Sequence, residues 1–259
     1  MTTFEEYRSR YRYVDLTRQD GILQIRLHRD NEKATWSSGI GGLHDELGDA
    51  FLQVARDPDN RVVILTGTGD DFMLAVDDRE PPPEFGSVEL WARIEREGRD
   101  LIDYLLAIPV PVIGALNGRA FIHAELIAMS DILIASDRAV MADKGHIPNG
   151  IVAGDGVHVW WPMILGPNRG RYFLLTGEEI GAEEAKRLGI VAEVVSQDQL
   201  LARAWEVARE MAAKPTLALR YSRLLFTRPI KRAMANDLGY GLALEALGAI
   251  DLAVSLSKS

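Results

Sequence analysis

The first half of the chain alternates strand-like and helix-like segments, and this alternation limits the possible folds more than any other feature. Residues 21–29 alternate apolar and polar side chains, which predicts a half-buried strand. In residues 43–55 apolar side chains recur every three to four positions, which predicts an amphipathic helix. Residues 61–66 form a continuous apolar run, which favours a strand buried on both faces.

The same alternation continues as far as residue 136. We predict a helix at 88–107, a strand at 110–116, the start of a helix at 124–129 and a strand at 131–136. Residues 77–86 contain three consecutive prolines, which helices and central strands do not tolerate, so we predict a loop there that could cover a pocket. Strands alternating with helices indicate an α/β layered fold.

Beyond Tyr172 the pattern becomes helical. We predict helices at 181–188, 198–213, 216–226 and 230–252, the last with a break near Gly239 and Gly241. The chain therefore divides into a core at residues 1–197 and a C-terminal helical region at residues 198–259. Appended helical regions of this kind often make subunit contacts.

Composition excludes several classes of function. The sequence has no cysteine, so its nucleophile must be an oxygen or a nitrogen. The formal net charge of −9 disfavours nucleic acid, whose binding draws on clustered Lys and Arg. Residues 1–13 carry charges without an apolar stretch, and no run approaches the roughly 20 apolar residues of a membrane span. We expect a cytoplasmic protein without a nucleic-acid or membrane partner.

Four motifs resemble, in order and spacing, those of the crotonase superfamily, the enoyl-CoA hydratases and isomerases. They are Asn-Arg-Val-Val-Ile-Leu-Thr-Gly-Thr-Gly at 60–69, Pro-Val-Pro-Val-Ile-Gly-Ala-Leu-Asn-Gly at 109–118, Met-Ser-Asp-Ile at 129–132, and Thr-Gly at 176–177. The resemblance implies a spiral of ββα turns, followed by a C-terminal helical region that trimerises.

The chain departs from that pattern where the catalytic groups of the superfamily would lie. Residues 122–125 read Ile-His-Ala-Glu where hydratases carry two glycines before a catalytic glutamate, so Glu125 is kept while the turn becomes bulky. His146 stands where the second catalytic glutamate would lie. Residues 29–36 replace an Arg-Pro and Asn-Ala motif, and the Glu-Gly and basic tail that helps to hold coenzyme A is missing. A hydratase would be damaged by these changes.

One branch of the superfamily is similar in these same places, namely the β-diketone hydrolases of the 6-oxocamphor hydrolase type. Blocks at 44–47, 150–156, 168–177 and 242–247 are similar nearly residue for residue. The resemblance implies a hydrolase that cleaves a carbon–carbon bond of a cyclic or bicyclic 1,3-diketone, without a cofactor, as a homotrimer or hexamer. The functional positions of that branch fall on Trp36, His44, His123, His146, Asp155 and Glu245.

These residue types suit the reaction. Water must add to one carbonyl, and the tetrahedral oxyanion then collapses and expels an enolate. His146 would activate the water, with Asp155 on its other ring nitrogen, since nine residues with a Pro-Asn-Gly turn could bring the pair together. The N–H groups of Trp36 and His123 would stabilise the enolate.

His44 and Glu245 could form a second acid/base pair that orients the water or reprotonates the enolate. Taken alone, Trp36, His44 and Glu245 have plainer explanations as core or solvent-facing side chains. We expect no metal site, because the sequence lacks a ligand motif such as His-Glu-x-x-His.

Two other functions stay open. A coenzyme A thioester enzyme is supported by the overall superfamily pattern and by Glu125. A catalytically silent interaction subunit would keep only the fold, but loss of function would scatter the replacements rather than gather histidines and carboxylates at the expected site.

Overall fold

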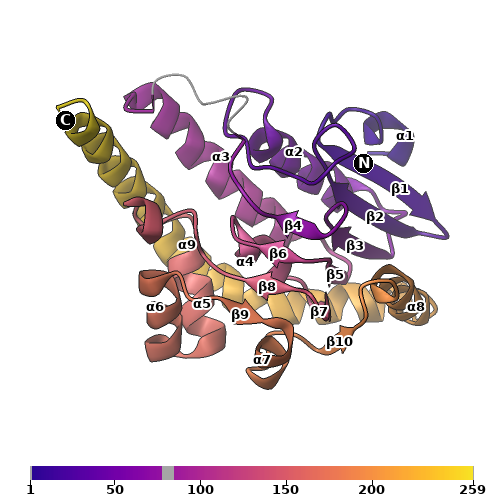
Figure 1. The fold of residues 1–259 in the computed structure, drawn as a ribbon. Helices are drawn as coiled ribbons and strands as arrows, with labels where there is room; N and C mark the ends of the chain where they lie inside the picture. The colour runs from indigo at the N-terminus through magenta and orange to yellow at the C-terminus, as the bar shows by residue number, and fades with distance from the viewer. Residues whose placement is uncertain (1, 78–84, 259) are drawn as a thin grey trace.

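The computed structural model describes residues 2–77 and 85–258, and its centre is a six-stranded β-sheet (Figure 1). The strand order is β1 (Val14–Gln19), β2 (Ile22–Leu27), β3 (Val62–Thr66), β5 (Val112–Leu116), β7 (Ile132–Ser136) and β10 (Glu193–Val195). β1 and β2 form an antiparallel hairpin, and the other neighbours run parallel. The strands predicted at 21–29, 61–66, 110–116 and 131–136 are β2, β3, β5 and β7.

A second, four-stranded sheet explains the spiral. Its order is β4 (Asp71–Met73), β6 (Arg119–Ala120), β8 (Val140–Met141) and β9 (Ile180–Gly181). The chain moves from the larger sheet to the smaller one three times, from β3 to β4, from β5 to β6 and from β7 to β8. This repeated step is the ββα spiral that the resemblance implied, and it confirms the fold.

Helices cover both faces of the larger sheet. In the described residues they are α1 (Phe4–Tyr7), α2 (Leu43–Arg56), α3 (Val88–Ala107), α4 (Ala124–Ala128), α5 (Val157–Leu165), α6 (Pro167–Thr176), α7 (Ala182–Arg187), α8 (Leu200–Ala212) and α9 (Thr216–Leu256), with a 3₁₀ turn η1 (Ile147–Asn149). The predictions for α2, α3, α4, α7 and α8 are confirmed to within two residues. α5, α6 and the short strands of the smaller sheet were not predicted.

Alternate residues of β3 point into two separate hydrophobic cores, which is why its sequence is a continuous apolar run. Val63 and Leu65 belong to the larger core, together with the apolar faces of α2 and α3. Val62 and Ile64 belong to a smaller core that α8 covers. The strand is thus buried on both faces, as predicted.

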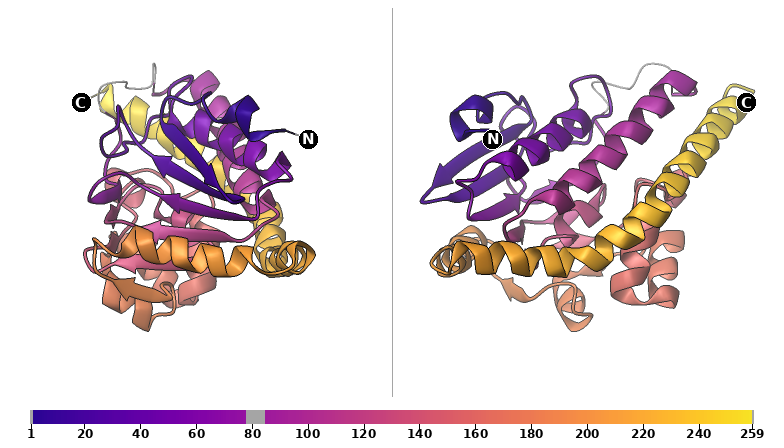
Figure 2. Two further views of the ribbon diagram at one scale, coloured as in Figure 1. Left: turned by 90° about the vertical axis from the view of Figure 1, so that its right-hand side faces the viewer. Right: turned by 180° about the vertical axis from the view of Figure 1, so that it is seen from behind.

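The C-terminal helix differs from the prediction. We expected two helices, 216–226 and 230–252, with a break near Gly239 and Gly241, but α9 is one helix of 41 residues that contains Pro229 and bends along its length (Figure 2). A Cβ atom at Gly241 would clash with His158 and with the carbonyl of Gly154. This glycine therefore serves close packing against α5 and does not end the helix.

By length and composition alone, α9 is long and apolar enough to cross a membrane, a test that the core helix of a soluble protein also passes. An 18-residue window of it has a mean hydropathy of 1.4, and 28% of that window is buried inside the chain. The helix packs against α3 and α5, and it still exposes Leu225, Phe226 and Tyr240. These apolar side chains make α9 a candidate subunit-contact surface.

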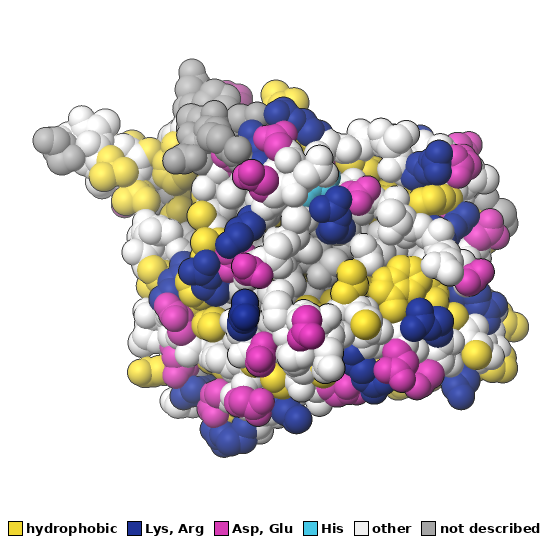
Figure 3. All heavy atoms as spheres, turned by 45° about the vertical axis from the view of Figure 1, so that its right-hand side comes forward, with side chains coloured by type: hydrophobic (Ala, Val, Ile, Leu, Met, Phe, Trp, Pro, Cys, Tyr) yellow, Lys and Arg dark blue, Asp and Glu magenta, His cyan; other side chains and the backbone are white. Residues whose placement is uncertain are grey.

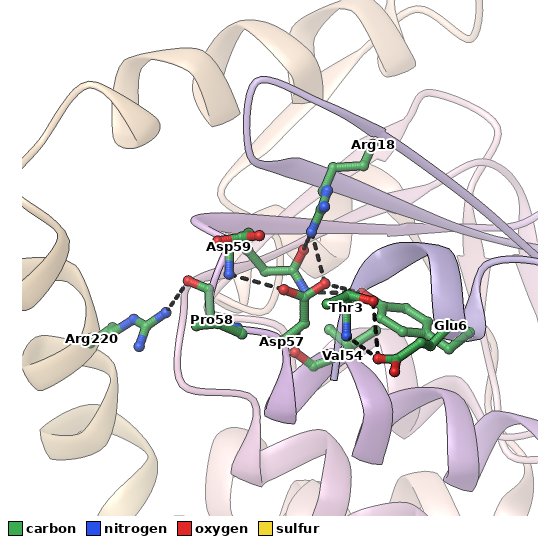
Figure 4. Close-up of polar contacts among 10 residues, drawn as sticks. Thr3, Glu6, Arg18, Val54, Asp57, Pro58, Asp59 and Arg220 are labelled. Carbon is green, nitrogen blue, oxygen red and sulfur yellow. Dashed lines mark hydrogen bonds and ion pairs between the residues drawn. The ribbon is translucent and has the colours of Figure 1, made fainter. Parts of the chain in front are cut away.

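Asp57, directly after α2, joins the N-terminal elements through buried polar contacts (Figure 4). Its carboxylate accepts hydrogen bonds from Tyr7 Oη at 2.9 Å, Arg18 Nη1 at 2.8 Å and the backbone N–H of Asp59 at 2.9 Å. Next to it, Arg220 Nη2 of α9 donates to the carbonyl of Pro58 at 2.7 Å. This bond joins the first part of α9 to the segment that follows α2.

On the face drawn in Figure 3, acidic and basic side chains are interspersed with apolar patches. Outside the grey atoms, this face shows no continuous basic stripe of the kind that follows a phosphate backbone.

Candidate active site

All six site residues named from the sequence line one cavity. Trp36 comes from the segment before α2, His44 from α2, His123 from the turn before α4, His146 from the start of η1, Asp155 from the turn before α5, and Glu245 from α9. The empty volume of the cavity, with its open mouth, is about 870 Å³. Residues separated by more than 200 positions therefore meet in one place.

Most of the remaining wall is apolar. Phe85, Trp91, Ile94, Ile151 and Leu242 contribute to it, and no Lys or Arg is among the described lining residues. A cavity of this kind suits a compact apolar molecule with few polar groups. Of the loop predicted at 77–86, residues 78–84 lie outside the described part of the chain.

His146 is held from both ring nitrogens. Its Nδ1 lies 2.8 and 3.0 Å from the two carboxylate oxygens of Asp143, and its Nε2 lies 3.3 Å from Oδ2 of Asp155. The turn predicted between His146 and Asp155 is present, since η1 is followed by Gly150 at φ 76°. The expected pair does meet, but the carboxylate that orients the ring through Nδ1 is Asp143, which sequence reasoning missed.

Asp155 lies between two histidines. Its Oδ2 is 3.1 Å from Nδ1 of His123, and the same nitrogen lies 2.8 Å from Oε1 of Glu125. His123 is the residue before α4 and adopts a left-handed backbone with φ 50°, which directs the chain into that short helix. Glu125 is buried at 2% exposure and is the partner of His123.

Trp36 is fixed by its backbone, and its ring packs at a tilt against two histidines. Its backbone N–H donates to the carbonyl of Ala75 at 2.9 Å, and its backbone carbonyl accepts from the N–H of Asp77 at 2.7 Å. The ring centroids of Trp36 and His123 lie 3.8 Å apart, and those of Trp36 and His44 lie 5.1 Å apart. Trp36 and His123, the two expected donors, are therefore neighbours.

His44 lies beside a different carboxylate from the one expected. Its Nδ1 lies 3.4 Å from Oε2 of Glu97 on α3, and Arg93 Nη1 holds the same carboxylate at 3.0 Å. Glu245 instead lies near His146, with Oε1 3.9 Å from Nε2. Burial lowers the pKa of His44 despite Glu97, so its imidazole is neutral at neutral pH.

Burial and mutual charge separate the pKa values of the other groups. Burial alone would lower the pKa of His123, but the carboxylates of Glu125 and Asp155 outweigh it and raise the pKa to about 10. Burial is likewise outweighed at His146, where Asp155 and Asp143 raise the pKa well above its usual value. Burial, with the charge of Asp155, raises the pKa of Glu245 to about 8. At neutral pH the site thus holds two cationic imidazoles, His123 and His146, and a protonated acid, Glu245.

Two groups of side chains have the composition of metal ligands. One consists of His123, Glu125 and Asp155, and the other of His146, Asp155 and Glu245, so the groups share Asp155. Within each, the ligand atoms lie within 4.8 Å of one another.

Comparisons with known proteins agree with this architecture. The sequence model of the enoyl-CoA hydratase/isomerase family matches residues 17–243. A β-diketone hydrolase from the cyanobacterium Anabaena sp. PCC 7120, solved with bound (S)-3-oxocyclohexyl acetic acid, is 44% identical with a TM-score of 0.92 and covers 95% of this chain and 98% of its own. An enoyl-CoA hydratase/isomerase from Mycobacterium paratuberculosis is 26% identical with a TM-score of 0.85. The match covers 92% of this chain and 94% of that one. Carnitinyl-CoA dehydratase of Escherichia coli K12 is 33% identical over 214 residues, 80% of this chain and 77% of that protein.

Proposed function

This chain belongs to the enoyl-CoA hydratase/isomerase family, and we propose that within the family it is a hydrolase that cleaves a carbon–carbon bond of a cyclic or bicyclic 1,3-diketone to a keto acid. The observation that carries the proposal is the meeting of His146, Asp155 and Glu245 with Trp36 and His123 in one largely apolar cavity. The similarity to a β-diketone hydrolase over 95% of the chain supports it.

The first step is the addition of water. Because its pKa is raised, His146 acts as the base only in its neutral form, which takes a proton from the water through Nε2 while the water oxygen bonds to one carbonyl carbon. Asp143 holds Nδ1 of His146 and keeps the ring in this orientation. Asp155, beside Nε2, stabilises the imidazolium that forms. The product of this step is a tetrahedral oxyanion.

The second step breaks the carbon–carbon bond. The oxyanion collapses to a carboxylic acid, and the electron pair of the broken bond passes to the neighbouring carbon as an enolate. Trp36 and protonated His123 offer N–H donors to the enolate oxygen, in a cavity where low polarity strengthens such bonds.

The third step protonates the enolate carbon. Glu245 supplies the proton, since its raised pKa keeps it protonated at neutral pH. The proton that His146 took from water then returns to Glu245, whose Oε1 lies 3.9 Å from Nε2. The cycle consumes one water and one diketone and needs no cofactor.

A coenzyme A thioester reaction is the competing function, because carnitinyl-CoA dehydratase is 33% identical. The absence of Lys and Arg among the described lining residues disfavours a substrate that carries phosphates. The experiment is parallel incubation with a bicyclic 1,3-diketone and with crotonyl-CoA. We expect loss of diketone absorbance and a keto acid; turnover of crotonyl-CoA alone would reject the proposal.

We also propose that the chain works as a homotrimer or a hexamer in the cytoplasm. The exposed apolar residues of α9, such as Leu225, Phe226 and Tyr240, would then lie between subunits. Light scattering should give three or six times the mass of one chain, whereas a monomer would contradict this assembly.

A further inference from the structure

Three side chains of the cavity present their ligand atoms at the spacing of a metal site. Nε2 of His146 lies 3.3 Å from Oδ2 of Asp155 and 3.9 Å from Oε1 of Glu245, and the three atoms lie within 4.8 Å of one another. Zn²⁺ binds nitrogen and oxygen at about 2.0–2.2 Å in a tetrahedron, which places neighbouring ligands about 3.3–3.6 Å apart. Small shifts of these side chains would therefore enclose a zinc ion.

The ring of His146 is already oriented as in zinc sites. A zinc-bound histidine usually donates its other ring N–H to a carboxylate, which fixes the ring and strengthens the ligand. Here Nδ1 of His146 lies 2.8 Å from Asp143, so Nε2 is left to face Asp155 and Glu245. Asp143 therefore has the position of an outer partner.

Buried oxygens at the site lack hydrogen bonds. Oδ1 of Asp155 and Oε2 of Glu245 are buried and have no hydrogen-bond partner in the described chain. Unpaired buried carboxylate oxygens are costly, because water no longer solvates them. One Zn²⁺ would displace the protons of His146 and Glu245, and its charge would balance the two carboxylates.

The neighbouring group fits an ion less well. In the group of His123, Glu125 and Asp155, Nδ1 of His123 lies 2.8 and 3.1 Å from the carboxylate oxygens, which are hydrogen-bond distances. An ion would have to push these atoms apart. His146, Asp155 and Glu245 all line the cavity, so a fourth coordination position there is open to it.

We propose that His146, Asp155 and Glu245 form a zinc site whose occupancy inhibits the enzyme. The inhibition rests on the proposed function, because zinc would take the lone pair that His146 uses as a base and the carboxylate that Glu245 uses as an acid. The binding itself depends only on the three ligands.

The test is calorimetric titration of the purified full chain with ZnCl₂. We expect one ion per chain, binding at least tenfold weaker in Glu245→Gln, and about 10- to 100-fold weaker in Asp143→Asn. Glu125→Gln is the matched control and should bind as the wild type does. Thermal unfolding of each variant shows whether it is folded. If Glu245→Gln does not fold, Asp143→Asn still tests the site.

Two results would overturn the site: no zinc binding by the wild type, or weakened binding in Glu125→Gln with unchanged binding in Glu245→Gln. In the diketone assay, ZnCl₂ should lower the rate of the wild type and a chelator should restore it. Activity that zinc leaves unchanged or increases would overturn the inhibition. Zinc binding by a chain that cleaves no diketone would support the site and reject the proposed function, so the two failures are distinguishable.

Discussion

Nε2 of His146 lies 3.3 Å from Oδ2 of Asp155, although the two residues stand at opposite ends of a loop. The pair does not act alone. Asp143 holds Nδ1, the other ring nitrogen, and Oε1 of Glu245 lies 3.9 Å from Nε2. One imidazole is therefore surrounded by three carboxyl groups, and its protonation decides when water can be activated.

Asp143→Asn should move the pH dependence of the reaction. The negative charge of Asp143 helps to raise the pKa of His146, and only neutral His146 can accept a proton from water. Its removal lowers that pKa, so the rising limb of kcat against pH should shift to lower pH while the maximal kcat falls. Asp137→Asn, an exposed change, is the control. A rising limb that stays in place would contradict the role of Asp143.

Glu245→Gln should lower kcat at pH 7 by about 10²-fold or more, as loss of a general acid does. The pKa of Glu245 is raised to about 8, so its proton is present below that pH and is lost above it. The wild-type rate, measured with a chelator present, should therefore decline as pH rises through about 8. The residual rate of the variant should show no such decline; a wild-type decline that persists in Glu245→Gln would assign it to another group.

Trp36→Phe removes the indole N–H and keeps one aromatic ring. If this group stabilises the enolate, kcat should fall by about 10²- to 10³-fold in a variant that thermal unfolding shows to be folded. Trp205→Phe is a matched control, because Trp205 on α8 donates its N–H to Gln24, away from the cavity. Equal rates for both variants would show that Trp36 only lines the wall.

Arg223→Met should destabilise the fold by about 3–5 kcal/mol, because it leaves a charge without its partner. Arg223 is 2% exposed, lies 2.7 Å from Asp131, and donates to the carbonyls of Leu106 and Ile108. Urea unfolding measures the change. Arg228→Met, exposed on the same helix, should change stability by about 0.5 kcal/mol or less.

The sequence predicts those elements whose periodicity is long and undisturbed. The helix predicted at 88–107 is α3, and the apolar run at 61–66 contains β3. The strands of the smaller sheet have two or three residues each, too few to show a period. The break predicted in α9 is absent. Gly241 is required there for close packing against His158, and the helix continues through it.

The candidate site was predictable in part. The resemblance identified six residues that line one cavity, including Glu245, which no local pattern marks. Asp143 carried a signal that was overlooked, since it precedes His146 by three residues. No sequence signal marks Glu97, because a glutamate on the polar side of a long helix is ordinarily solvated. Only the tertiary structure brings it to His44.

The most direct measurement is the rate of keto acid formation from a bicyclic 1,3-diketone by the wild type, His146→Gln and Asp155→Asn, with product identified by mass spectrometry. The wild type should form the keto acid, and both folded variants should form it at least tenfold more slowly. Equal rates in all three proteins would remove His146 and Asp155 from the chemistry. A wild type that leaves the diketone intact would contradict carbon–carbon hydrolysis itself.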